Sequence, residues 1–283
     1  MIRPFMRFPE GRERALTLSY DDAVHQDKKL IDIMNRHGIK GTFNVNTGNP
    51  YWRGEGGNDH FCIREMKEWY LDNGHEVAVH AVSHPFLEQL PTASALMEVL
   101  EDRRNLEQEL GIVVRGMAYP MGTTDDELVE ALGHSGIAYA RTIVSTGRFD
   151  IPTDWLRMPA TCHHNDPRLM ELWEQFMAPY ANSRKTPRLF YLWGHAYEFD
   201  NNDNWDVIEK FCETAGGHDE VWYATNIEVY DYVQAYERLQ WSVDMKRVYN
   251  PSVIPVWFYA TEWPSNTTGC YVVRPGETLE LKQ

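Results

Sequence analysis

Segments with the apolar spacing of buried β-strands alternate along this chain with segments that have the spacing of amphipathic helices. This alternation restricts the possible folds more than any other feature. The expected strands are 14–20, 39–46, 76–80, 112–119, 137–142, 188–193 and 221–224. The expected helices are 27–36, 65–73, 93–110, 124–132, 205–214 and 227–239. Strands that alternate with helices at this interval form parallel β-α units, and these units together predict a closed or nearly closed α/β barrel.

The alternation ends near residue 247, after which the chain is strand-like and interrupted by proline and glycine. We therefore expect a barrel over 1–247 and a small C-terminal β extension over 248–283 that packs on it. The four cysteines are widely spread and form no C-x-x-C pair, which favours reduced thiols. The sequence has neither a run of signal-peptide type nor a transmembrane-length run, so we expect a cytoplasmic protein without a membrane partner.

The charge of the chain restricts its partners. Lysine and arginine number 27 against 42 aspartates and glutamates, which gives a net charge of −15. Nucleic acids and anionic membranes require a basic face, so we exclude both as partners. Hydrophobic residues make up 43% of the chain, an ordinary proportion for a globular protein. The aromatic content of 13% is high, and part of it is available to line a binding pocket.

Polar residues with metal-binding or acid-base chemistry follow three of the expected strands. Asp21 and Asp22 follow the first strand, His80 and His84 the third, and His195 the strand 188–193. In an α/β barrel these strand ends lie around the active site. Two histidines four residues apart on a helical turn, together with one carboxylate, can bind one cation. Each cluster alone also fits a helix N-cap or a core histidine, but their shared position at strand ends favours a site.

Five ordered motifs give these clusters a more specific meaning. Residues 19–23 (SYDDA) correspond to a TFDDG-like first motif, and residues 80–84 (HAVSH) to an H-[ST]-x-x-H second motif preceded by Gly74-His75-Glu76. Residues 118–122 (AYPMG) are similar to a third motif, R-x-P-Y, and residues 192–195 (LWGH) to a fifth motif with Leu and His. In these motifs the chain resembles the polysaccharide deacetylase family, carbohydrate esterase family 4, with its NodB-homology domain.

The resemblance implies a distorted (β/α) barrel of about seven parallel strands and assigns roles to individual residues. Asp22, His80 and His84 would bind a divalent metal, usually Zn²⁺, with Asp21 as catalytic base and His195 as general acid. A metal in such a site lowers the pKa of water and polarises an acyl oxygen. The backbone N–H near Met121 would help to hold the oxyanion.

The sequence also departs from the family pattern. Ala118 stands where many relatives have the arginine that orients the base, and Arg157 is a candidate replacement, although a surface arginine fits equally well. Asp154, in a possible fourth motif, would hold the tautomer of His195, or else cap a turn. Gly194 is an insertion relative to a strict L-x-H fifth motif.

Two further sets of residues lie near the motifs. Tyr20, Tyr119 and Trp193 are expected to contact a sugar substrate, together with the nearby Trp155 and Tyr197. For His163 and His164 we expect an exposed polar loop, and for Glu198 and Asp200 either pocket lining or a solvated loop.

The leading functional hypothesis is a metal-dependent hydrolase that removes N- or O-linked acetyl groups from an acetylated carbohydrate. One alternative is a metal-dependent amidohydrolase that acts on a non-sugar amide or cyclic imide. The other is a carbohydrate-binding protein that has lost catalysis, which the retention of Asp21 and His195 argues against. The sequence makes no prediction of oligomeric state.

Overall fold

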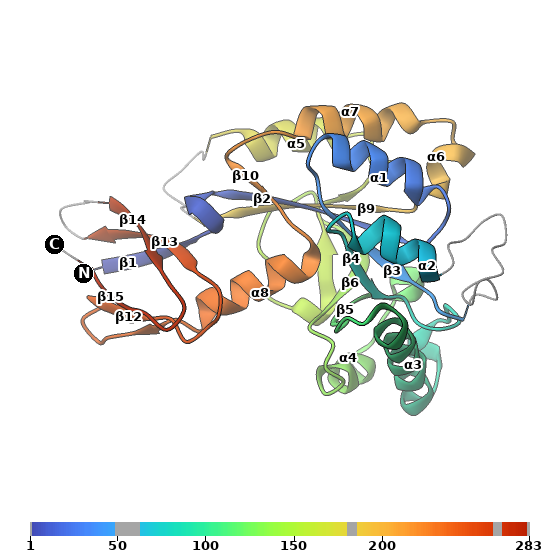
Figure 1. Ribbon diagram of the computed structural model, residues 1–283, viewed down its shortest axis with the longest axis horizontal. Helices are drawn as coiled ribbons and strands as arrows, with labels where there is room; N and C mark the ends of the chain where they lie inside the picture. Colours follow the sequence, from blue (N-terminus) through green and yellow to red (C-terminus); the bar gives the residue numbers. More distant parts are fainter. Residues whose placement is uncertain (1, 49–62, 180–185, 263–267, 282–283) are drawn as a thin grey trace.

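The computed structural model describes residues 2–48, 63–179, 186–262 and 268–281 (Figure 1). Nine strands form one sheet in the order β7-β6-β5-β4-β3-β2-β9-β8, with β10 beside the start of β2. All their pairings are parallel. The strands are β2 (Arg14–Asp21), β3 (Gly41–Val45), β4 (Glu76–Val79), β5 (Gly116–Ala118), β6 (Tyr139–Ser145), β7 (Met158–Ala160), β8 (Cys162–His163), β9 (Arg188–Gly194) and β10 (Val221–Tyr223).

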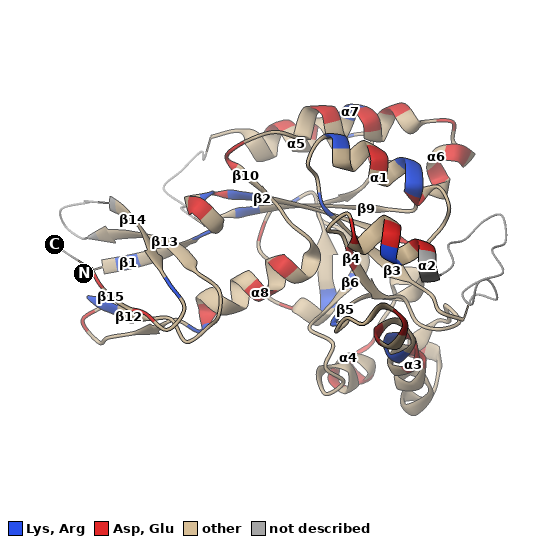
Figure 2. Ribbon diagram, viewed as in Figure 1, with Lys and Arg blue, Asp and Glu red and all other residues tan. Residues whose placement is uncertain are grey.

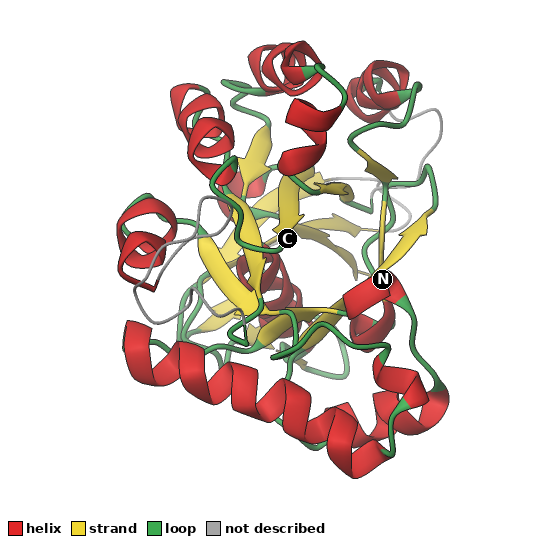
Figure 3. Cartoon of the chain, turned by 90° about the vertical axis from the view of Figure 1, so that its right-hand side faces the viewer, coloured by secondary structure: helices red, strands yellow, loops and turns green. Residues whose placement is uncertain are grey.

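The sheet is strongly curved. Strands β7 and β8 stand at opposite ends of the strand order, yet only Thr161 separates them in the chain. The Thr161 N–H donates to the Tyr191 carbonyl of β9 at 2.8 Å, so both ends of the sheet meet in one segment. Figure 3 shows the strands in the middle of a ring of helices. The predicted distorted (β/α) barrel is confirmed in this form, although the described strands do not make one continuous closed ladder.

Most of the expected helices are present. The helices are α1 (Asp27–Arg36), α2 (Ile63–Met66), α3 (Thr92–Leu110), α4 (Asp126–Gly133), α5 (Leu169–Met177), α6 (Tyr197–Asn201), α7 (Trp205–Ala215) and α8 (Asn226–Glu237). Short helical turns are η1 (Pro9–Gly11), η2 (Lys67–Leu71), η3 (Leu87–Gln89), η4 (Pro120–Gly122) and η5 (Trp155–Arg157). The bounds of α1 agree with the prediction, whereas the single helix expected over 65–73 is divided into α2 and the π-helical η2.

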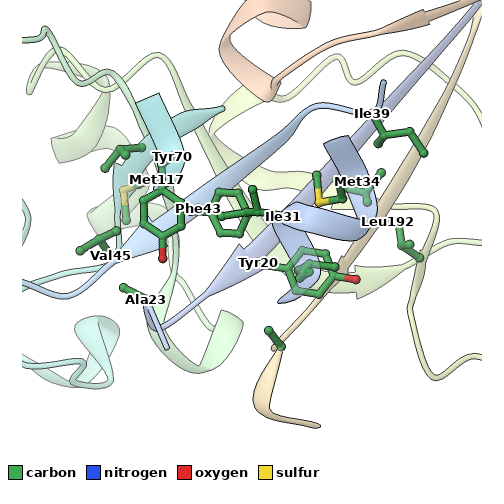
Figure 4. Packing of buried hydrophobic residues seen from close by; sticks show 14 of the residues in the cluster. Tyr20, Ala23, Ile31, Met34, Ile39, Phe43, Val45, Tyr70, Met117 and Leu192 are labelled. Carbon is green, nitrogen blue, oxygen red and sulfur yellow. The ribbon is translucent and has the colours of Figure 1, made fainter. Parts of the chain in front are cut away.

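The main core lies between the sheet and its outer helices (Figure 4). Phe43 of β3 stacks on Tyr70 with 4.3 Å between ring centroids, and Met34 of α1 is fully buried. Tyr70 also donates a 2.6 Å hydrogen bond to the buried Asp27 at the start of α1. Burial of each large apolar side chain contributes about 1.5–3 kcal/mol, so this packing fixes β2 and β3, which carry part of the site.

A polar cluster inside the barrel attaches helix α8 to the strands. The Glu76 carboxylate accepts hydrogen bonds from the Ile227 N–H at 2.9 Å and from the hydroxyls of Thr42 and Tyr139, each at 2.8 Å. Burial raises the pKa of Glu76 to about 7, although these hydrogen bonds oppose the rise. Thr225 and Glu228 form a capping box at the start of α8.

Two small antiparallel sheets form the appended β part. Strands β1 (Ile2–Arg7), β13 (Val256–Glu262) and β14 (Thr268–Val273) make the first sheet. Strands β11 (Gln240–Trp241), β12 (Arg247–Tyr249) and β15 (Thr278–Glu280) make the second. Figure 1 shows both sheets at the left, beyond α8 and away from the carboxyl ends of the barrel strands.

The appended part therefore includes an N-terminal strand and residues near 240, in addition to the expected C-terminal segment. The division into 1–247 and 248–283 stays a prediction, and residues 263–267 and 282–283 of the second part lie outside the described residues. Among the described helices, none has both the length and the apolar character needed to cross a membrane.

Candidate metal and catalytic site

The predicted metal ligands come together at the carboxyl ends of β2 and β4. Asp22 directly follows β2, His80 directly follows β4, and His84 lies in the bend after it. The Asp22 Oδ1 atom lies 3.7 Å from His80 Nε2 and 3.9 Å from His84 Nε2. Three ligand atoms at these separations can bind one cation.

The backbone that brings the two histidines together differs from the prediction. Residues 80–84 form a bend and no helical turn, with positive φ at Ala81 (62°) and His84 (54°). The rings of His80 and His84 meet edge to face, 4.7 Å apart. The buried Asp102 of α3 accepts the His80 N–H at 3.0 Å, and Asn46 donates to the His80 and Ala81 carbonyls. These polar contacts, none of which was predicted, hold the backbone of the bend in place of the hydrogen bonds of a helical turn.

The donor set fits a divalent metal. His80 Nδ1 lies 2.9 Å from the Ala118 carbonyl, so Nδ1 carries the proton and Nε2 presents its lone pair toward Asp22. Burial lowers the pKa of His80 against the opposing charges of Asp21 and Asp22, which favours the neutral imidazole that binds metals. Asp22 and His84 are partly exposed, at 22% and 29%, so the site is open on one side.

Asp21 lies beside these ligands in an almost fully buried position, with 3% exposure. Its Oδ1 accepts a 2.8 Å hydrogen bond from Asn44, and its Oδ2 accepts one from Arg141 Nη2. His80 Nε2 and His195 Nε2 lie 3.8 and 3.7 Å from Oδ2. Burial alone would raise the pKa of Asp21, but the charges of Arg141, His80 and His195 outweigh burial and lower the pKa to about 2. Asp21 is therefore ionised at neutral pH.

Arg141, and not Arg157, is the arginine that the structure places on Asp21, the predicted base. Arg141 is completely buried on β6, and its guanidinium lies 4.6 Å from the centre of the Trp193 ring. Arg157 instead pairs at the surface with Asp126 and, at 3.2 Å, with Asp154. The sequence did contain a signal for Arg141, because a charged residue inside an apolar strand requires a buried counter-charge.

Glu198, and not Asp154, is the carboxylate that the structure places on His195, the predicted acid. His195 Nδ1 lies 2.8 Å from Glu198 Oε1, three residues further along the chain. Asp154 instead accepts the Leu156 N–H at the start of η5. Burial lowers the pKa of His195, but the hydrogen bond to Glu198 and the charges of Asp21 and Asp22 raise it above its ordinary value. Asp200, the other candidate, accepts a hydrogen bond from Trp205.

The pair His163 and His164 is less exposed than predicted. His164 is completely buried and packs against the rings of Tyr20 and Phe199. It also explains the extra Gly194 in the fifth motif, because a Cβ atom at this position would overlap the His164 ring. Gly194 thus lets β9 pass close to the buried imidazole.

The predicted substrate-contacting rings are mostly buried. Tyr20 and Tyr119 are each 1% exposed, and the Tyr119 hydroxyl donates to the Leu156 carbonyl at 2.8 Å. These two rings have almost no surface to offer to a ligand, which corrects their predicted role. Trp193 is 8% exposed and covers Arg141. Met121 has a positive φ of 56° in the turn η4 after β5, and its oxyanion role stays a prediction.

Comparison with known proteins finds a family model that matches the N-terminal part of the barrel. Residues 9–140, which include β2, β3, β4 and β5, match the sequence model of the polysaccharide deacetylase family. The match covers somewhat less than half of the chain, and over this segment the chain is similar to that family. No curated protein matches the sequence.

Solved structures support the fold. A candidate polysaccharide deacetylase from Mycobacterium smegmatis has a TM-score of 0.59 and 16% identity, over 84% of this chain and 96% of that chain. The chitin deacetylase from Colletotrichum lindemuthianum has a TM-score of 0.51 and 17% identity, over 80% and 89% of the two chains. At these identities the likeness establishes a shared fold.

Proposed function

We propose that this protein is a metal-dependent hydrolase that removes acetyl groups from an acetylated carbohydrate. The observation that carries the proposal is the position of Asp21. Its carboxylate lies between Arg141 and His195, beside the cluster of Asp22, His80 and His84. A binding protein needs neither a buried, charge-stabilised carboxylate nor a histidine facing it, whereas hydrolysis needs both a base and an acid. The match of residues 9–140 to the polysaccharide deacetylase model and the likeness to a chitin deacetylase fold support the same class of reaction.

Asp22, His80 and His84 would hold the metal, most plainly Zn²⁺ because two of the three ligands are imidazoles. When bound, a divalent metal supplies Lewis-acid polarisation of an acyl oxygen and makes water a stronger nucleophile at neutral pH. The hydrogen bond from His80 to the Ala118 carbonyl keeps that ring in the orientation a ligand needs.

The proton transfers belong to two other residues. Asp21, ionised and oriented by Arg141 and Asn44, accepts a proton from the attacking water. His195 Nδ1 carries a proton and donates it in a hydrogen bond to Glu198, which turns Nε2 toward the reacting groups. In the imidazolium form, which the raised pKa of His195 favours, the Nε2–H donates its proton to the leaving amine or alcohol and leaves the neutral Nδ1–H ring. Each transfer typically contributes a factor of about 10² to 10⁴ in rate.

The acidic surface supports a substrate that is not a polyanion. Acidic residues are prominent along α6 and α7 (Figure 2), in keeping with the net charge of −15. A neutral glycan, or one that gains a cationic amine on deacetylation, is compatible with this surface. Cytoplasmic residence stays a prediction.

The test is a panel of N- and O-acetylated oligosaccharides beside ureides and cyclic imides, with released acetate measured directly. We expect acetate from at least one sugar, and loss of both turnover and bound metal in His80→Ala. Turnover of imides alone would contradict the sugar assignment. Sugar affinity without turnover under any divalent metal would contradict catalysis.

A further inference from the structure

A second layer of polar residues lies behind the general acid. Glu198 belongs to the short helix α6, directly after His195, and its two carboxylate oxygens face different neighbours. Its Oε1 lies 2.8 Å from His195 Nδ1. Its Oε2 accepts a 2.8 Å hydrogen bond from Asn165 Nδ2, and lies 3.0 Å from His164 Nε2 and 3.4 Å from His163 Nε2. One carboxylate therefore connects the acid with three consecutive residues of the segment 163–165.

The positions of the ring protons follow from these contacts. His163 Nδ1 accepts the Asn165 backbone N–H at 3.1 Å, so the proton of a neutral His163 is on Nε2 and faces Glu198. His195 Nδ1 faces a carboxylate and must also carry a proton. Its Nε2 is then the nitrogen that points toward Asp21. The carboxylate thus determines which nitrogen of His195 faces the reacting groups.

The same groups could in principle hold a cation, since His163, His164 and Glu198 bring three ligand atoms together. Two contacts oppose this. His163 Nδ1 is already an acceptor, which leaves no lone pair for a metal on its neutral Nε2. Neither ring nitrogen of the buried His164 makes a hydrogen bond with the described residues, and its Nδ1 lies against Gly194, whereas metal-binding imidazoles almost always have such a partner.

We propose that segment 163–165 positions the general acid through Glu198. Asn165 donates a hydrogen bond to one oxygen of the Glu198 carboxylate, and His163 and His164 place ring nitrogens beside the same oxygen. The other oxygen fixes the orientation and tautomer of His195. Buried His164, packed on Phe199 at 4.1 Å between ring centroids, gives this arrangement a rigid support. Glu198 and Asn165 are thus positioning residues, and the inference rests on the proposed hydrolase function for its kinetic consequences.

Glu198→Gln tests the proposal because an amide offers one acceptor and one NH₂ donor. With its oxygen toward the donors of 163–165, its NH₂ faces His195 Nδ1, which must then accept a hydrogen bond and move the ring proton to Nε2. We expect kcat to fall about 100-fold or more with little change in KM, as for loss of an acid or base. Asn165→Ala removes one exposed donor, and we expect a fall of about three- to tenfold in kcat.

Asp200→Asn is the matched control, since Asp200 lies on the same helix but bonds only to Trp205 among the contacts described for it. We expect its kinetics to equal those of the wild type. The second readout is the ¹⁵N NMR spectrum of histidine side chains in the metal-loaded protein, with His195 assigned from its loss in His195→Gln. We expect an Nδ1–H tautomer in the wild type and in Asp200→Asn, and an Nε2–H tautomer in Glu198→Gln.

The outcomes separate the proposals. An unchanged tautomer in Glu198→Gln, or unchanged kcat in Asn165→Ala, would overturn the positioning role. Binding of two metal ions per chain, with one lost in Glu198→Gln, would overturn it in favour of a second metal site. If no acetylated sugar is turned over by the wild type, the proposed function fails, while the NMR comparison still decides the role of Glu198.

Discussion

Replacement of Arg141 by methionine removes a buried charge while keeping an unbranched side chain of similar reach. The Arg141 side chain is completely buried and donates to the 3% exposed Asp21. Without this donor the Asp21 carboxylate would face a buried environment with Asn44 as its remaining short hydrogen-bond donor among the contacts described for it. The substitution therefore tests whether Arg141 is the residue that keeps the base ionised and oriented.

The magnitude follows from the pKa of Asp21. This pKa is about 2, against an ordinary value of 3.8. The difference corresponds to about 2–3 kcal/mol of native-state stability. Because the pKa is lowered, that stability is fully present above about pH 4 and is lost as the pH falls toward 2. Breaking a buried ion pair costs about 3–5 kcal/mol, so we expect Arg141→Met to lower the free energy of unfolding by about 3 kcal/mol or more at pH 7.

Urea denaturation of the metal-free protein measures this loss, and acetate release measures activity. We expect kcat to fall by a factor of about 10² or more, while metal content is retained because Asp22, His80 and His84 are untouched. Arg157→Met is the matched control, and as a surface substitution it should change stability by about 0–1 kcal/mol and leave activity unchanged. The double variant Asp21→Asn/Arg141→Met should be more stable than Arg141→Met alone, because it leaves no buried charge unpaired. A loss of activity in Arg157→Met with none in Arg141→Met would show that Arg141 is not the residue that keeps Asp21 ionised and oriented.

Three further predictions concern the packing of β9, the polar cluster inside the barrel and the metal ligands. Gly194→Ala should lower the free energy of unfolding, measured by urea denaturation, by about 1–3 kcal/mol, because the added Cβ overlaps the buried His164 ring. Gly133→Ala is the control and should not destabilise, because its Cβ makes only an ordinary contact with Leu156. Equal stabilities of the two variants would contradict the proposed clash. The pKa of Glu76 is about 7 in the folded protein, against an ordinary value of 4.5. Folding therefore favours the protonated carboxyl, so its contribution to stability is fully present below about pH 4.5 and is lost as the pH rises through 7. The stability difference between wild type and Glu76→Gln should therefore change by up to about 3 kcal/mol across this window, and a constant difference would show that Glu76 is ionised throughout. Asp22→Asn and His84→Ala should each lower zinc content measured by mass spectrometry, and full occupancy in both would rule out this ligand set.

The sequence predicted the barrel from local patterns, and the resemblance to a family, together with the strand ends, predicted the residues that the structure brings together as a candidate metal site. Apolar periodicity marks strands such as β2 and β9, and Asp22, His80 and His84 directly follow strands whose carboxyl ends must meet. The segment β7 to β8 was missed because strands of three and two residues are too short to show periodicity. Strand β1 gave no sign of its partner, because it pairs with β13 near the other end of the chain.

The residues that orient the base and the acid were missed for a different reason. Arg141 meets Asp21 across 120 residues of sequence, and only the curvature of the sheet brings β6 opposite β2. Glu198 was considered as pocket lining, but its contact with His195 depends on α6 beginning directly after β9. In both cases the charge was visible in the sequence and its partner was decided by tertiary structure.

The central claim is that hydrolysis requires a metal bound by Asp22, His80 and His84. Acetate release from an acetylated oligosaccharide, measured before chelation, after removal of the metal and after addition of Zn²⁺, tests it most directly. We expect chelation to abolish acetate release and Zn²⁺ to restore it in the wild type but not in His80→Ala. Full activity in protein verified to be metal-free would show that hydrolysis does not need this metal.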